Sequence, residues 1–122
     1  MNVFNQPLAT AVPLNANYTS PNALVRLMVT YTMAANITGT PNGSIHLEAS
    51  NDPLTNELTN PTQPVPTNFA TITNSTFTVT APGTVMWNVY WTGYNYVRVV
   101  YTDASGGTST ALMNIVMNAK GI

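Results

Sequence analysis

Apolar and polar residues alternate along several stretches of this chain, most clearly in residues 44–50, SIHLEAS. Ile45, Leu47 and Ala49 fall on one side of an extended backbone and the residues between them are polar, which is typical of a half-buried strand. The alternation stops at Asn51-Asp52-Pro53, where Asn and Asp favour turns and Pro cannot donate to a strand ladder. The pattern therefore predicts a strand that runs directly into a loop.

The same period of two recurs elsewhere, and no segment shows the period of a helix. In residues 96–102, YVRVVYT, it directs the residues at 97, 99 and 101 inward and Arg98 to the opposite face, and in residues 84–90 it places Trp87 in the core. Seven or eight short strands at intervals of about 8–12 residues predict an all-β fold, a single antiparallel β-sandwich or jelly-roll-like domain. The expected strands are residues 31–37, 44–50, 71–73, 76–80, 84–90, 96–102 and 110–118, with a short edge strand near 8–12.

The connections between these strands carry signals of their own. Residues 1–21 contain three prolines and no sustained period, which predicts an extended N-terminal arm before a β-sandwich domain at residues 22–122. Such an arm either lies along its own domain or reaches a neighbouring subunit. Asn42-Gly43 is a hairpin signal, so residues 31–37 and 44–50 are expected to pair as an antiparallel hairpin. The four prolines of residues 51–70 predict a long loop of the kind that often carries function.

Charge changes this picture, because only 6% of the residues are charged and the net charge is −1. An ordinary soluble domain carries about 25% charged residues, so the polar surface here must consist of Thr, Asn and Ser. No basic patch is available for phosphates or anionic lipids, and no apolar stretch approaches 18 residues, which argues against nucleic-acid binding and membrane insertion. A weakly charged surface has little protection against association and favours a homo-oligomer. The alternative is a monomer kept soluble by neutral hydroxyls and amides.

Residue types that catalyse reactions or bind metals are scarce. The chain has no cysteine and one histidine, His46, which shares a strand face with Glu48. Two ligands at that spacing do not complete a zinc set, and Asp52 lacks the acidic neighbours of a calcium loop. No GxSxG motif accompanies the histidine. We therefore expect no catalytic residues, no metal and no cofactor, an Asx turn at Asp52, and a stabilising ion pair between Arg98 and either Glu48 or Asp52.

Hydrophobic side chains in the arm, the long loop and the turn before residue 96 are candidates for subunit contacts or ligand binding. An exposed aromatic turn at Trp91 and Tyr94 would suit a protein or a sugar, and the alternative is that both rings fold back over the core. Phe69, near the end of the long loop, is expected to dock that loop on the core. The full set of candidates is Phe4, Leu8, Val12, Leu54, Leu58, Val65, Phe69, Trp91 and Tyr94.

One series of motifs runs through residues 23–121. It begins at Gly39 and continues through the segment GSIHLEASNDP, which ends at Pro53. A Pro-rich loop follows and ends near Asn68-Phe69. The remaining motifs are Trp87, the strand YVRVVYT, Gly106-Gly107 and a final strand that ends at Lys120-Gly121. This order resembles that of small bacteriophage and related viral virion proteins, which are β-sandwich modules found as head decoration proteins, head fibres, or tail and baseplate adhesion parts. That family often has Trp at the position of Phe69. None of the motifs is catalytic.

The resemblance implies a non-enzymatic structural protein of the virion. Its most direct form is a capsid-associated decoration or cement protein, or a minor capsid protein, that binds neighbouring virion proteins through its arm and loops. The alternative is a tail, fibre or spike module that binds a host receptor or glycan through residues 51–70 or through the aromatic turn. Both alternatives place the protein in the virion.

Overall fold

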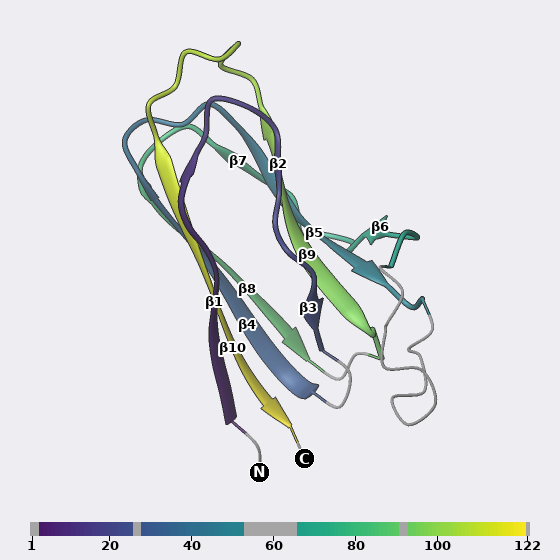
Figure 1. Ribbon diagram of the computed structural model, residues 1–122. Coiled ribbons are helices and arrows are strands. Elements are labelled where there is room, and N and C mark those ends of the chain that lie inside the picture. Colours follow the sequence, from purple (N-terminus) through teal and green to yellow (C-terminus); the bar gives the residue numbers. More distant parts are fainter. Residues whose placement is uncertain (1–2, 26–27, 53–65, 91–92, 122) are drawn as a thin grey trace.

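The computed structural model describes residues 3–25, 28–52, 66–90 and 93–121, with side chains from residue 5 onward. These residues form ten strands in two antiparallel sheets that pack face to face, as Figure 1 shows. The predicted all-β sandwich is therefore confirmed. None of the described segments forms a helix with the length and hydropathy needed to span a membrane. In chain order the strands are β1 (Val3–Pro13), β2 (Tyr18–Thr19), β3 (Ala23–Leu24), β4 (Met28–Thr38), β5 (Gly43–Ser50), β6 (Ala70–Thr71), β7 (Phe77–Val79), β8 (Gly83–Tyr90), β9 (Tyr96–Asp103) and β10 (Leu112–Gly121).

The two sheets differ in how their edges are built. Sheet A has four strands in the order β1-β10-β4-β8, so its edges are strands of eleven and eight residues. Sheet B has the order β2-β9-β5-β6, with β3 also paired to β9 and β7 also paired to β5. Its edge strands are only two or three residues long. Short strands of this kind show no periodicity in a sequence, which explains why ten strands form where seven or eight are expected.

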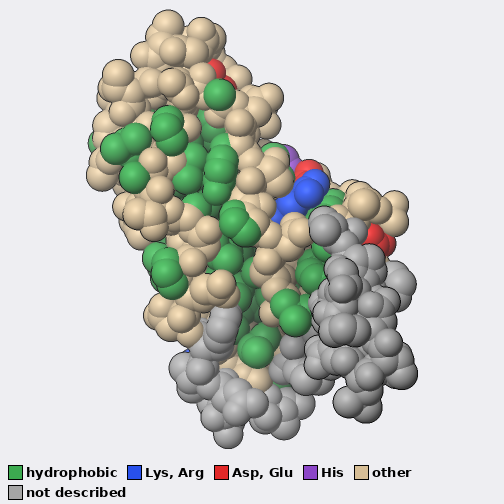
Figure 2. Space-filling model, in the orientation of Figure 1, with side chains coloured by type: hydrophobic (Ala, Val, Ile, Leu, Met, Phe, Trp, Pro, Cys, Tyr) green, Lys and Arg blue, Asp and Glu red, His purple; other side chains and the backbone are tan. Residues whose placement is uncertain are grey.

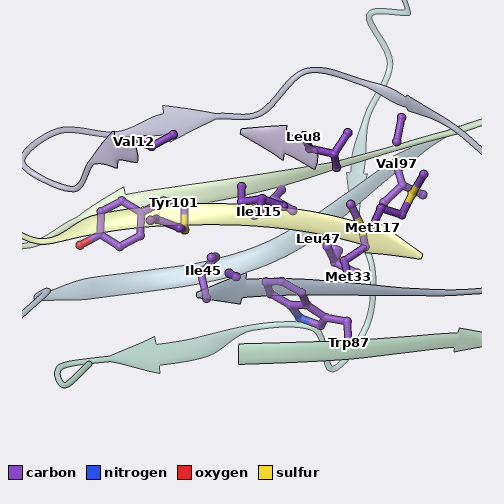
Figure 3. Packing of buried hydrophobic residues seen from close by; sticks show 14 of the residues in the cluster. Leu8, Val12, Met33, Ile45, Leu47, Trp87, Val97, Tyr101, Ile115 and Met117 are labelled. Atoms are coloured by element: carbon purple, nitrogen blue, oxygen red, sulfur yellow. The ribbon is translucent and has the colours of Figure 1, made fainter. Parts of the chain in front are cut away.

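The core lies between the sheets and takes its side chains from the inward positions of the long strands (Figure 3). Alternation buries the residues that it predicts, because successive side chains of a strand point to opposite faces. Trp87 of β8 is 5% exposed and donates its indole N–H to the carbonyl of Ser75 at 2.7 Å, so its polar atom is satisfied inside the core. The buried side chains of β4 and β9 are Tyr31, Met33, Ala35, Ile37, Tyr96, Val97, Val99 and Tyr101.

The predicted hairpin of residues 31–37 and 44–50 is wrong. β4 pairs with β10 and β8 in sheet A, whereas β5 pairs with β9, β6 and β7 in sheet B. Two strands that each have one apolar face can bury those faces across a sandwich as well as side by side, and the sequence pattern is the same in both arrangements. A type I′ turn needs positive φ at both central residues, but neither Asn42 nor Gly43 has one. The connection instead carries the chain from one sheet to the other.

The N-terminal segment forms an edge of sheet A. β1 pairs with β10 from Val3 to Pro13. The arm therefore lies along its own domain, which is one of the two arrangements expected for it. Prolines are tolerated at an edge because one side of the strand needs no hydrogen-bond donors. The pairing shifts register on both sides of Ala9, and Ala11 has a φ of 53°. Residues 3–13 therefore contribute an irregular strand to the sandwich.

Candidate functional site

A pocket lies where the long loop leaves and rejoins sheet B. Its volume is about 660 Å³. One wall comes from the end of β5 and the residues that follow it, a second from residues 67–73, and Tyr94 closes the side next to β9. The lining residues are Ala49, Asn51, Asp52, Thr67, Asn68, Phe69, Ala70, Thr71, Ile72, Thr73 and Tyr94.

Asp52 holds the two ends of the long loop together. Its Oδ2 accepts hydrogen bonds from the backbone N–H groups of Thr67 at 2.7 Å and Asn68 at 3.0 Å, and its Oδ1 accepts one from Asn68 Nδ2 at 2.9 Å. The bonds from Asn68, followed by the one from Thr67, hold the pKa of Asp52 below its ordinary value. The expected Asx turn at Asp52 would use the N–H of residue 54, which lies outside the described residues. Within the described residues, this carboxylate accepts its bonds from residues far along the chain.

A second set of bonds fixes the aromatic turn beside this loop base. Asn95 donates its side-chain N–H to the carbonyl of Asp52 at 3.0 Å and its backbone N–H to the carbonyl of Ser50 at 3.1 Å. The Asn95 carbonyl in turn accepts from the N–H of Val25 at 3.0 Å. These contacts bring Tyr94 to the same pocket as Phe69, although the two residues belong to different connections.

A charged cluster lies next to the pocket on the outer face of sheet B. Arg98 donates to Glu48 Oε1 through Nε at 2.9 Å and through Nη2 at 2.7 Å, and His46 Nε2 lies 3.1 Å from Glu48 Oε2. Glu48 and Arg98 stand directly opposite each other on β5 and β9, so the predicted ion pair is confirmed with Glu48 as the partner. Figure 2 shows these atoms together in a hollow of a surface that is otherwise largely uncharged on this side.

Phe69 covers this ion pair. Its ring centroid lies 3.7 Å from Arg98 Cζ, which is a close cation–π contact. Partial burial raises the pKa of Glu48, but the hydrogen bonds from His46 and Arg98 and the positive charge of Arg98 outweigh it, so the pKa lies below its ordinary value. The loop therefore docks on the outer face of sheet B through Phe69 rather than on the hydrophobic core.

The other predicted site residues have different positions. Leu8 and Val12 are each 8% exposed and belong to the core of the chain itself. Phe4 stands opposite Ala119 in the pairing of β1 with β10, and its side chain is outside the description. Leu54, Leu58, Val65 and Trp91 lie outside the described residues.

The sequence did not reveal the roles of Asp52 and Asn95. Both act through partners that are distant along the chain, and no local motif identifies such partners. The single hint was the position of Asp52 in the turn that follows β5, which favours a polar residue for several unrelated reasons.

A second surface was also missed, namely the outer face of sheet A. The register places Pro7, Val116, Ala34 and Met86 in one row across all four strands, so an apolar band crosses this face. Amide and hydroxyl rows flank the band. Asn5 donates to Asn118 at 2.6 Å, and Thr84 donates to Asn36 at 2.7 Å. Among the described outward positions of this face, Lys120 is the only one with a charge.

Comparison with known proteins indicates what this fold resembles. No protein-family model matches the chain, and no curated protein matches its sequence. Its structure is similar to that of the SPBc2 prophage-derived protein YomS, with a TM-score of 0.58 and 13% sequence identity over 97% of this chain and 92% of that one. The chain therefore shares its fold with a prophage-derived protein.

A second structure, of Bacillus endospore appendages that form disulfide-linked pili, gives a TM-score of 0.47 and 10% identity over 98% of this chain and 88% of that one. This similarity is too weak to support an argument about fold or function.

Proposed function

We propose that this chain is a non-enzymatic structural protein of a virion, and specifically a capsid-associated decoration or cement protein or a minor capsid protein. The observation that carries the proposal is the outer face of sheet A, which spans four strands, bears almost no charge and has no covering segment among the described residues. Met86, Tyr90 and Leu112 of this sheet are 55%, 61% and 42% exposed. A surface of this kind is stable against aggregation when a neighbouring protein covers it.

The polar groups of the chain support a structural role. Glu48 is engaged by Arg98 and His46, and Asp52 is engaged by the backbone of the long loop. Asp103 accepts bonds from Ser105 and Gly107, so all three described carboxylates serve internal contacts. Within the described residues no group of three His, Cys, Asp or Glu is placed to hold a metal ion. The fold shared with a prophage-derived protein supports the assignment to a virion.

The copy number in purified particles tests this proposal. Quantitative peptide mass spectrometry would compare this chain with the major shell protein in particles purified from a producing culture. A number comparable to that of the shell protein supports a decoration or cement role. A handful of copies in a multiple of three, five or six moves the protein to a vertex, fibre or tail, and none at all overturns the virion assignment.

The pocket at the loop base favours a second candidate function, the binding of a glycan on a host receptor. Phe69 and Tyr94 line it together with the amides of Asn51 and Asn68, and aromatic rings beside amides suit the apolar faces and hydroxyls of a sugar. A glycan array followed by titration of any hit would test this function. Tyr94→Ala should abolish binding, whereas Tyr90→Ala, which truncates an exposed ring outside the pocket, should not. A blank array excludes this candidate.

A further inference from the structure

The four edges of the two sheets are protected very unequally. An exposed edge strand presents unpaired N–H and C=O groups to any extended chain, and proteins usually protect such edges with short strands, prolines, charges or bulges. On sheet B the edges are strands of two or three residues. On sheet A, β1 contains Pro7 and Pro13, two register shifts and the positive φ of Ala11. These three edges therefore resist the addition of another strand.

β8 has none of these features. It pairs with β4 over eight residues, from Gly83 opposite Ile37 to Tyr90 opposite Thr30, without a shift in register. Its sequence, GTVMWNVY, contains no proline and no charged residue. No described strand pairs with its other side. β8 is thus a regular, uncharged edge that is open to further pairing.

The side chains along this edge are large, hydrophobic and exposed, as in a contact surface. Met86 and Tyr90 are the two most exposed large hydrophobic residues of the described chain, and Phe77, which packs edge-on against Trp87, is 42% exposed. A pocket of about 190 Å³ lies beside the edge, between residues 86–89 of β8 and residues 72–77. This pocket offers space for the side chains that an added strand would direct toward the core side.

We infer that the free edge of β8 binds β8 of a second copy of this chain, antiparallel and about a two-fold axis, so that two sheets A join into one continuous sheet. The other edges of the second copy do not fit, because they are short or interrupted by prolines. Two β8 strands are uncharged and therefore bring no like charges together. This pairing does not depend on the proposed virion role, because it requires only two copies of this chain and no other protein.

The pattern of β8 also restricts the register. Directly opposite residues of an antiparallel pair share a face, so the outward Met86 must stand opposite another outward residue. A pair centred on Met86 places the two methionines together and Thr84 opposite Asn88 of the second copy. It also places Val85 opposite Trp87 of the second copy on the core side. The apolar band across sheet A would then continue through both copies.

Cysteine cross-linking tests the contact and the register together, because the chain has no cysteine of its own. Opposite residues of an antiparallel pair have Cα atoms about 4.5–5.5 Å apart, which is within the span of a disulfide. Met86→Cys should therefore form a disulfide-linked dimer on mild oxidation. The control is Leu112→Cys, an exposed apolar position on the same sheet but on an interior strand, which should remain monomeric under the same conditions. Equal cross-linking of both variants, or of neither, overturns the inference.

Charge substitution provides the second measurement, on soluble protein by light scattering after size-exclusion chromatography. The wild type should reach the dimer mass as its concentration rises. Met86→Lys should raise the dissociation constant about tenfold or more, because like charges would stand opposite each other. Leu112→Lys should leave it unchanged. A mixture of Met86→Lys and Met86→Glu should recover the dimer. A wild type that stays monomeric, or a Met86 position that links to a different protein in particles, overturns self-pairing.

Discussion

Gly43 offers the sharpest test of the packing at the crossing between the sheets. It opens β5 at the point where the chain enters sheet B, and it stands opposite both Val79 and Asp103. A Cβ added at this position would lie 2.6 Å from the phenolic oxygen of Tyr101 and 2.7 Å from Tyr101 Cζ, and it would also collide with the carbonyl oxygen of Thr102. The backbone φ is not positive, so the obstacle is space and not backbone strain.

The neighbours of Gly43 have little freedom to move. The side chain of Tyr101 is fully buried, and Thr102 is fixed in the ladder opposite Ser44. Overpacking of a well-packed site costs about 1–3 kcal/mol, and the reduced freedom of the unfolded chain returns only about 0.4–1 kcal/mol. We therefore expect Gly43→Ala to lower the free energy of unfolding by about 1–2 kcal/mol. For a domain of 122 residues this corresponds to a Tm lower by about 4–8 °C.

Urea titration and thermal unfolding followed by circular dichroism would measure both quantities. Gly93→Ala is the matched control, because a Cβ there meets no heavy atom of the described residues within 4 Å and its φ is not positive. That variant should equal the wild type or exceed it slightly. If Gly43→Ala and Gly93→Ala unfold at the same urea concentration and temperature, the close approach of Gly43 to Tyr101 is not a feature of the protein.

Three further substitutions test the polar contacts. Arg98→Met should lower the unfolding free energy by about 1–2 kcal/mol, because Glu48 loses its ion pair with Arg98 and Phe69 loses its cation–π contact. A thermal midpoint equal to that of the wild type would contradict this prediction. Because the pKa of Asp52 is lowered, its hydrogen bonds stabilise the fold fully above about pH 4 and are lost as the pH falls below that value. Asp52→Asn should therefore flatten the dependence of the urea midpoint on pH in acid. An unchanged slope would refute this role of Asp52. Trp87→Phe removes the hydrogen bond to the Ser75 carbonyl and should lower the free energy of unfolding by about 1–2 kcal/mol, measured by urea titration. No change would mean that water replaces the hydrogen bond.

Local pattern was sufficient for the long strands from β5 onward and for the faces that they bury. The alternation in residues 96–102 identified Val97, Val99 and Tyr101 as core residues, and all three have no exposed surface. It also places Arg98 and Glu48 on polar faces, and these two residues stand opposite each other on β9 and β5. These features depend on residues one or two positions apart in the chain, so they can be read directly from the sequence.

Pairing partners were not accessible in the same way. The period of two is identical whether β4 lies beside β5 or across the sandwich from it, so the hairpin prediction had no physical basis for choosing correctly. The Asp52 clamp joins residues fifteen and sixteen positions apart across the long loop. The difference between the β1 and β8 edges also depends on knowing that both strands are edges. In each case the missing information is the arrangement of distant segments.

The position of β10 has a consequence for biosynthesis. This strand follows all the others in the chain, yet it lies between β1 and β4, and it pairs Lys120 with Val3. One of the two interior strands of sheet A is therefore missing until residues 112–121 have left the ribosome, while β1, β4 and β8 are already outside it. Nascent strands with unpaired backbone groups are prone to mispairing. Until β10 emerges, β1 has no partner in sheet A and β4 can pair only with β8.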